Sequence, residues 1–446
     1  MPGGYRRGAV YAFYFLAGLC GLTYEVIWSR ILGAYLGSTD VANAVVLGTF
    51  MGGLALGARV FGPWADRLRQ PLRTYGALEA CIGLYALFSP LFFDETLGGP
   101  TLDPSRVALA VFALLPPTVL MGGAFPLLTR YLTSRTIDLR RNVGHLYAFN
   151  TAGSVLGGLL AGFWMLGTFS PATALGAMGG VNLALGLFVV AAARNAPSRL
   201  EPHPVSDRPG LEDAVSYGPA ARRMALLLAG FSGVATMALE MAWTHELAGA
   251  LGDSTHGLSL MLTAFLSGSA LGALALASRR AGRFALPDLV GVALLATGLL
   301  LFCTHSLYQS LAGALTAADG PPDWAYLPCF LAILVPTTAA GLVFPAAVRL
   351  GADEEHVGGH VGHLYAVNTL GTLLGAVVAG LIILPLFGAE VIFTAAVVAY
   401  ALVGLALVWR GSLLSRARVN RGRPPGAARV FALSVNELET PKDEVG

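Results

Sequence analysis

The sequence predicts an all-α polytopic membrane protein with twelve transmembrane helices, arranged as two parallel six-helix repeats. Of its 446 residues 55% are hydrophobic and only 12% are charged, and the mean hydropathy is +0.66. This composition is far too apolar for one soluble core. The stretch at 143–162, VGHLYAFNTAGSVLGGLLAG, also returns almost unchanged at 361–380 as VGHLYAVNTLGTLLGAVVAG, which divides the chain into two related halves.

Apolar runs of about 20 residues, long enough to cross the hydrocarbon core of a bilayer, predict the helices in order. Six lie before the middle of the chain and six after it: 9–36, 41–64, 72–93, 106–133, 143–167, 170–193, 223–251, 256–278, 285–307, 325–350, 361–386 and 388–410.

Two polar segments separate and follow these helices. Residues 194–222 are rich in Pro, Arg, Asp and Ser and have no apolar period, which is typical of a solvated linker. The last segment begins basic and ends acidic, so we expect it to be disordered. The predicted organisation is an N-terminal six-helix repeat at 1–193, a cytoplasmic linker at 194–222, a C-terminal six-helix repeat at 223–410 and a cytoplasmic tail at 411–446.

The repeat extends well beyond its best-kept stretch. Glu25-Val-Ile-Trp28 matches Glu240-Met-Ala-Trp243 at an offset of 240 − 25 = 215. Within the long stretch the offset is 363 − 145 = 218, and it pairs His145 with His363, Tyr147 with Tyr365, and Asn150 with Asn368. Because each half holds an even number of helices, both halves start on the same side of the membrane, as parallel repeats do.

The basic residues predict the orientation, because Lys and Arg accumulate on the cytoplasmic side of a membrane. Among all Lys and Arg, only Arg30 and Arg106 fall on the opposite side from the rest. We therefore expect a multi-pass protein of the cell inner membrane with both termini in the cytoplasm.

Both copies of the long stretch set small residues four apart, as helices that approach closely in lipid do. These small faces, Gly153–Gly162 and Gly371–Gly380, predict the surfaces on which the two halves move against each other. Pro117 and Pro336, in the fourth and tenth helices, predict paired sites of bending.

Two motifs indicate a family. The segment from Gly57 to Arg69, which includes Asp66, is similar to the Gly/Asp/Arg signature between the second and third helices of the major facilitator superfamily. The spacing of Gly18, Glu25 and Trp28, together with the tyrosine-asparagine stretches, resembles the membrane domain of fused major-facilitator/spermidine-synthase-like proteins over residues 9–410. The resemblance implies a major-facilitator-like fold in which the first and seventh helices line a central cavity.

The resemblance also has departures. Many relatives continue into a cytosolic aminopropyltransferase-like domain, but no Gly-x-Gly strand-helix unit follows Arg410. His145 and His363 stand where the resemblance implies a basic residue, often Arg. No catalytic residue can therefore be assigned, and an enzymatic role has no motif to support it.

The candidate substrate-binding residues are polar or aromatic groups at membrane depth. A carboxylate there costs at least about 3 kcal/mol on insertion scales, so Glu25 and Glu240 either tie helices together or bind a cation or proton in a cavity. We favour the cavity. Trp28 and Trp243 offer ring faces to an organic cation or pack in the core. Asn150 and Asn368 contact the solute or hydrogen-bond between helices.

A second group of residues is assigned to gating or coupling. Glu79 lies in the third helix without a counterpart in the second half, and Asp66 belongs to the loop signature. The remaining members are the duplicated pairs His145 with His363 and Tyr147 with Tyr365. The histidines start their helices beside Arg-rich loops, where an interfacial or capping role is the alternative. The four cysteines have no paired spacing, so we expect no metal and no cofactor.

Two functions remain open. The first is a secondary transporter of a small organic solute, cationic or polyamine-like. The second is a membrane subunit or scaffold for a separate, cytosolic spermidine-synthase-like aminopropyltransferase or methyltransferase. The expected partners are the lipid bilayer and a small-molecule solute, with no nucleic acid.

Overall fold

The computed structural model describes residues 3–37, 39–92, 103–134, 136–194, 196–197, 199–200, 217–251, 255–315, 326–352 and 355–421. Within these ranges the regular structure is entirely helical. Twelve of the helical segments are long and apolar enough to cross a membrane, which confirms the predicted fold class. Large apolar side chains such as Phe112 and Leu381 lie more than two-thirds exposed on the outside, as a bilayer-facing surface requires.

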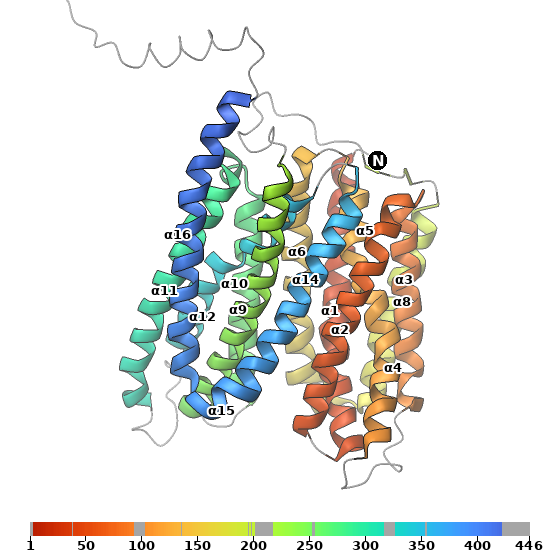
Figure 1. Ribbon diagram of the computed structural model, residues 1–446. Coiled ribbons are helices and arrows are strands. Elements are labelled where there is room, and N and C mark those ends of the chain that lie inside the picture. Colours follow the sequence, from red (N-terminus) through yellow and green to blue (C-terminus); the bar gives the residue numbers. More distant parts are fainter. Residues whose placement is uncertain are drawn as a thin grey trace, which may run out of the picture.

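The first half runs through α1 to α8 and the second through α9 to α16, side by side in Figure 1. The bounds in the first half are α1 Gly3–Leu36, α2 Thr39–Arg67, α3 Pro71–Phe88, α4 Pro104–Gly122, α5 Ala124–Leu132, α6 Thr136–Leu159, α7 Leu166–Thr168 and α8 Pro171–Ala192. Those in the second half are α9 Pro219–Leu251, α10 Thr255–Ala277, α11 Leu286–Leu315, α12 Tyr326–Ala340, α13 Val343–Gly351, α14 Val357–Val378, α15 Leu384–Phe387 and α16 Ala389–Arg421.

The fourth and tenth spans are each broken into two helices. Pro126 and Pro345 have no N–H to donate to the carbonyl four residues earlier, at Gly122 and Gly341, where the breaks fall. Prolines also lie further back in α4 and α12. At its other end α4 starts with a cap, because the Ser105 N–H donates to Asp103 at 2.9 Å, and this bond lowers the pKa of that exposed carboxyl.

Both ends of the chain's helical part lie at one end of the bundle. The N-terminus and the last turn of α16 are together at the top of Figure 1, and we call this the termini end and the opposite one the far end. α16 continues to Arg421, so residues 411–421, expected in the tail, are helical. The linker residues 201–216 and the tail residues 422–446 lie outside the described residues.

The small faces of the duplicated stretch do not lie between the halves. A Cβ on Gly153 would lie 1.9 Å from the Phe15 carbonyl oxygen, and one on Gly157 would lie 2.1 Å from that of Leu19, both on α1. Gly371 and Gly375 face α9 in the same way. The expectation that these faces carry the movement between halves is wrong, because they fix two helices of the same half against each other.

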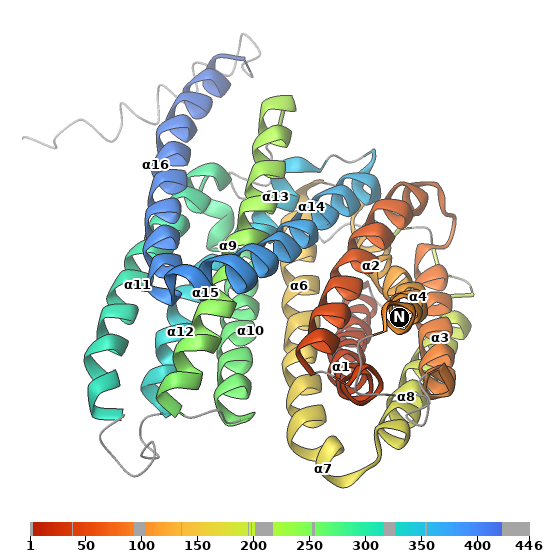
Figure 2. The same cartoon turned by 60° about the horizontal axis from the view of Figure 1, so that its bottom comes forward.

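Other small residues line the contact between the halves. A Cβ on Gly362 of α14 would lie 2.2 Å from the Ala58 carbonyl oxygen of α2, and one on Gly62 would lie 2.8 Å from that of Gly358. On the opposite side of the bundle, a Cβ on Gly144 of α6 would lie 2.7 Å from the carbonyl oxygen of α10 residue 273. These contacts lie toward the termini end, and α2 and α14 diverge from there toward the far end (Figures 1 and 2).

Replacing Gly157 by Leu should destabilise the protein, because its side chain would collide with rigid α1 backbone. Overpacking of this kind costs about 1–3 kcal/mol or more. Gly162 lies five residues further along the same span and has no atom within 4 Å of a Cβ, so Gly162→Leu is the matched control. Thermal unfolding in detergent should show a lower Tm for the first variant only. Equal Tm values would contradict the packing role.

Candidate functional site

A cavity of about 130 Å³ lies in the first half, bounded by α1, α2, α3, α4, α5, α6 and α8 and lined on one side by Tyr365 of the second half. Its wall is polar for membrane depth. The polar residues that line it are Tyr14, Tyr24, Glu25, Glu79, Asn150, Ser154, Asn182 and Tyr365. A Cβ on Gly21 of α1 would have no atom within 4 Å, and this glycine lines the cavity, which leaves room beside Glu25.

Glu25 reaches the cavity from α1. Its neighbours Tyr24 and Trp28 are fully buried, whereas the Glu25 side chain is partly accessible. Among the described residues, no hydrogen bond or ion pair is recorded for its carboxyl group. A carboxyl group at membrane depth without a protein partner is costly, so this group is available to a ligand.

Glu240 holds the equivalent position on α9. It does not line the Glu25 cavity, but it lies close enough to Glu25 for the two charges to interact. Its described contacts involve the backbone, whose carbonyl accepts from the Thr244 hydroxyl at 2.8 Å. Two like charges repel, so a cation bound beside Glu25 would also reduce this repulsion.

Glu79 lines the same cavity from α3 and is 3% exposed. Its carboxyl group is hydrogen-bonded by the side chains of Tyr75 and Asn182. Asn182 also donates to the Glu79 backbone carbonyl at 3.2 Å. The sequence analysis selected Glu79 but missed Asn182, although an amide within the apolar span of α8 was a signal that could have identified it.

Neither Trp28 nor Trp243 lines the cavity around Glu25, so their rings are not placed beside a cation bound there. The Trp28 indole N–H donates to the Ser89 hydroxyl at 3.0 Å, and its ring stacks on Tyr24 with centroids 5.4 Å apart. Trp243 packs on Phe393 with centroids 4.8 Å apart. Although residues three apart share a helix face, the Trp28 ring is fully buried between Tyr24 and Ser89, whereas Glu25 lines the cavity. Core packing, the alternative left open, fits the position of Trp28, whereas Trp243 also lines a separate small cavity in the second half, and a binding role for it stays a prediction.

The duplicated asparagines tie helices together within each half. Asn150 donates to the Tyr14 carbonyl at 3.2 Å, and Asn368 donates to the Ala229 carbonyl at 2.9 Å. Only Asn150 also lines the cavity around Glu25. The duplicated bond has the same geometry on both sides because residues 14 and 229 are themselves related by the repeat offset of 215.

The duplicated tyrosines belong to an aromatic cluster that joins the halves. Tyr365 packs on Phe125 with centroids 5.4 Å apart, and Tyr147 packs on Phe344 at 5.5 Å. Phe125 and Phe344 meet at 6.2 Å. The cluster borders the cavity at Tyr365, so a gating role for the tyrosines stays a prediction with suitable geometry.

Each of the two histidines lies two residues before one of these tyrosines, on the same helix. His145 is within 2.7 Å of the Arg141 carbonyl through Nδ1 and stacks on Tyr11, whereas His363 is exposed. Neither lines a described cavity. The interfacial role, the alternative considered for them, fits these positions.

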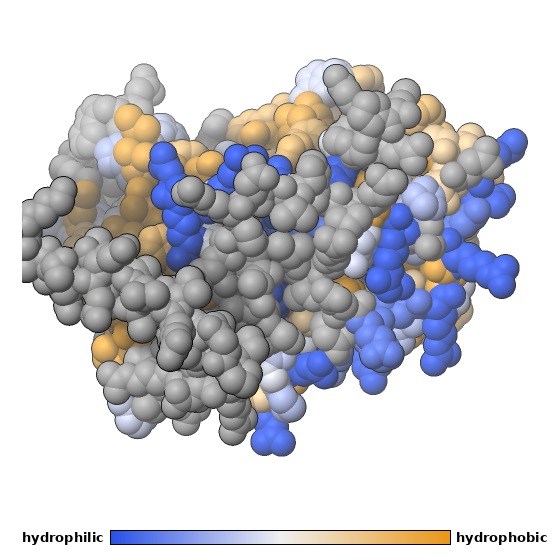
Figure 3. Space-filling view, turned by 90° about the horizontal axis from the view of Figure 1, so that it is seen from above, coloured by the Kyte–Doolittle hydropathy of each residue, from blue (hydrophilic) through white to orange (hydrophobic). Residues whose placement is uncertain are grey.

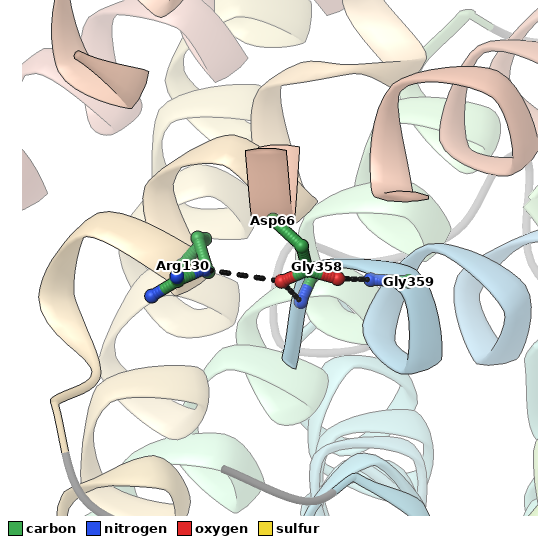
Figure 4. Close-up of polar contacts among 4 residues, drawn as sticks. All are labelled: Asp66, Arg130, Gly358 and Gly359. Carbon is green, nitrogen blue, oxygen red and sulfur yellow. Dashed lines mark hydrogen bonds and ion pairs between the residues drawn. The ribbon is translucent and has the colours of Figure 1, made fainter. Parts of the chain in front are cut away.

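Asp66 connects the halves at the termini end (Figure 4). Its carboxylate lies 3.1 Å from the Arg130 Nε and accepts bonds of 2.8 Å from the N–H groups of Gly358 and Gly359. The last two are in the first turn of α14, where free N–H groups and the helix dipole favour an anion. The loop signature predicted a gating role for Asp66 but not these partners.

Arg140 makes a second connection, between α6 and α10, that the sequence analysis missed. Its guanidinium donates to the backbone carbonyls of Leu276 and, at 2.9 Å, Ser278. These carbonyls belong to the C-terminal end of α10, where a cation is favoured. The contact between the two halves is therefore held by the Asp66 carboxylate at the start of α14 and by the Arg140 guanidinium at the end of α10.

Exposed basic residues gather around the termini end. Figure 3 views this end and shows hydrophilic side chains along the rim of the first half. The exposed arginines near this end of the two halves are Arg59, Arg67, Arg69, Arg73, Arg141, Arg194, Arg223, Arg279, Arg280 and Arg283.

Comparison with known proteins supports the fold. No family model matches the chain. The structure is similar to a bacterial homologue of the iron transporter ferroportin in an outward-facing state, with a TM-score of 0.60, 15% identity and coverage of 90% of this chain and 98% of the other. It is also similar to the fucose:proton symporter of E. coli, with a TM-score of 0.56, 13% identity and coverage of 91% and 99%. A third similar structure is that of the human organic anion transporter MFSD10, with a TM-score of 0.57 and 17% identity. The match covers 91% of this chain and 100% of the transporter.

The chain therefore has the fold of major facilitator transporters.

In sequence, it is 30% identical over 197 residues to polyamine aminopropyltransferase 2 of Streptomyces coelicolor, covering 41% of this chain and 35% of that protein. Polyamine aminopropyltransferase of Mycobacterium tuberculosis is 28% identical over 191 residues, with coverage of 40% and 34%. The chain thus spans about a third of the length of these curated relatives.

Replacing Asp66 by Asn should loosen the termini end, because the ion pair with Arg130 and the charge on α14 are lost. Spin labels at Arg69 and Arg283, exposed on different halves, should show an added population at longer distance. Glu355→Gln is the matched control, since this exposed acid precedes the same helix and is not part of the Asp66 contacts. Identical distance distributions in all three proteins would contradict a closing role for Asp66.

Proposed function

We propose that the protein is a secondary transporter of a small organic cation, with polyamine-like amines as the substrate class. The observation that carries the proposal is Glu25, a carboxyl group that lines a cavity at membrane depth without a described protein partner. Intramembrane ionisable groups mark substrate and ion pathways. The transporters with the same fold support the class of function but not the solute.

The cavity suits a small amine. Its volume of about 130 Å³ is close to the roughly 150 Å³ that accepts benzene in an engineered protein core. Tyr14, Tyr24 and Asn150 place hydroxyl and amide groups in the wall, where they can orient an ammonium group beside Glu25. No Lys, Arg or His is among the residues that line it, so nothing there repels a cation.

The two halves supply the movement that transport needs. We infer that both termini are cytoplasmic in a cell inner membrane, because exposed arginines gather at the termini end. The contacts of Asp66 and Arg140 then close the cytoplasmic side. Opening that side requires α2 to separate from α14 and α6 from α10, while the glycine-lined contacts inside each half stay intact.

A second candidate is a membrane subunit that serves a separate aminopropyltransferase. The similarity to polyamine aminopropyltransferases over 197 residues favours it. This role predicts that a soluble aminopropyltransferase co-purifies with the detergent-solubilised protein from its native membrane. It would not require Glu25 to bind a solute.

Glu25→Gln should lower the uptake of radiolabelled spermidine and putrescine into proteoliposomes by about tenfold or more, because a hydrogen bond to a charged group contributes about 1.5–3 kcal/mol. Glu240→Gln should have a smaller effect, since Glu240 lies outside the cavity. Glu390→Gln, at an exposed position in the first turn of α16, is the control. Full uptake by the Glu25→Gln protein would refute the binding role.

Cysteine labelling tests the orientation. In a variant without the native cysteines, Arg280→Cys at the termini end and Ser105→Cys at the far end place thiols at exposed positions. A membrane-impermeant maleimide added outside intact spheroplasts should label the second and spare the first. The reverse pattern would place the termini outside.

A further inference from the structure

Glu79 has no acidic equivalent in the second half. Gly76 of α3 packs on Gly186 of α8, and Gly291 of α11 packs on Gly404 of α16, which fixes the equivalence of these helix pairs. At the same offsets, 79 + 215 = 294 and 182 + 218 = 400. Leu294 and Tyr400 therefore occupy the places of Glu79 and Asn182, and both are buried.

The surroundings of Glu79 can hydrogen-bond to the carboxyl group in either protonation state. Tyr75 donates its hydroxyl to the Phe13 carbonyl at 3.2 Å, and the same hydroxyl is bonded to the Glu79 carboxyl. The Asn182 Nδ2 donates, while its Oδ1 is buried without a hydrogen-bond partner in the described part of the chain. A hydroxyl and an amide both donate to a carboxylate and accept from a carboxylic acid.

Among the residues that the structure describes, no Lys, Arg or His lines the cavity around Glu79, so no basic side chain there fixes the charged form. The titratable groups that face Glu79 are Tyr75 on its own helix and Tyr14, Cys20 and Tyr24 on α1. Glu25 and Tyr365 of α14 share the cavity wall, whereas α2, α4, α5, α6 and α8 contribute no titratable group to that wall. A buried acid without a cationic partner is stable when it carries a proton and costly when it is charged, so its charged form needs a cation nearby.

From this geometry we propose that Glu79 is an exchangeable proton site, distinct from the Glu25 solute site, and that it couples transport to a proton gradient. The proton resides on the Glu79 carboxyl group and leaves through the shared cavity as a hydrated proton. A solute cation beside Glu25 favours the departure of this proton, because a positive charge in the same small cavity stabilises the Glu79 carboxylate. The coupling role rests on the proposed transport function, but the proton site itself can be measured without a solute.

Infrared titration of the full-length protein in lipid nanodiscs tests the site. Exposed Asp and Glu are ionised at pH 6, since their ordinary pKa values are near 4. A carboxylic C=O band that persists at pH 6 therefore reports buried acids. In the Glu25→Gln, Glu240→Gln double variant we expect one such band to remain, to shift in D₂O and to disappear as the pH rises.

Adding Glu79→Gln to the double variant should remove that band, while adding Glu390→Gln should leave it. Asn182→Leu, which keeps the acid, should move the pH at which the band disappears by about one unit or more, an effect that a purely structural role would not produce. Persistence of the band without Glu79, or its absence from the double variant, would overturn the proposal. So would its loss on exchanging choline for sodium at constant pH, which would make the site one for Na⁺. None of these outcomes depends on spermidine uptake, so a failed uptake experiment rejects the transport proposal separately.

Discussion

One carboxylate joins the two halves of the molecule. Asp66 meets Arg130 of its own half and two N–H groups of α14 in the other. Hydrogen bonds to a charged group contribute about 1.5–3 kcal/mol each, and a charge at a helix end adds up to about 2 kcal/mol when partly buried. The sum is of the same order as the roughly 5.5 kcal/mol that moves a two-state equilibrium from 1:99 to 99:1. Together with the Arg140 contacts, the free energy of this interaction is large enough to favour contact between the halves at the termini end and small enough for that contact to be broken.

The glycines divide into two sets with different tasks. Gly53, Gly57, Gly153 and Gly157 bring helices of one half within van der Waals contact of each other's backbone, and such contacts cannot lengthen without loss of packing. Gly62 and Gly362 create an equally close contact between halves, but only near the charged connection at Asp66. The halves are therefore internally fixed, as rigid-body motion of one half against the other requires.

The fold could be predicted from the sequence because length, apolarity and the repeat each constrain it independently. Which way a side chain faces could not. A membrane helix is apolar toward both lipid and its neighbours, so periodicity does not separate the two sides, and Trp28 was assigned to the cavity although it packs on Tyr24 and Ser89. Asp66 was identified through its loop signature, but its contact with α14 joins positions 292 residues apart. That pairing depends on how the halves meet, which neither half encodes alone.

The two halves share a frame but not a chemistry. The hydrogen bond donated by Asn150 in the first half corresponds to the one donated by Asn368 in the second. Likewise, the contact between Tyr147 and Phe344 corresponds to the one between Tyr365 and Phe125. These duplicated contacts hold helices and close the centre. Two residues of the cavity wall break the symmetry, because Glu79 and Asn182 correspond to Leu294 and Tyr400 in the second half. The sequence repeat alone therefore cannot identify Glu79, because this residue differs from its equivalent, and the proposed proton site lies where the two halves differ.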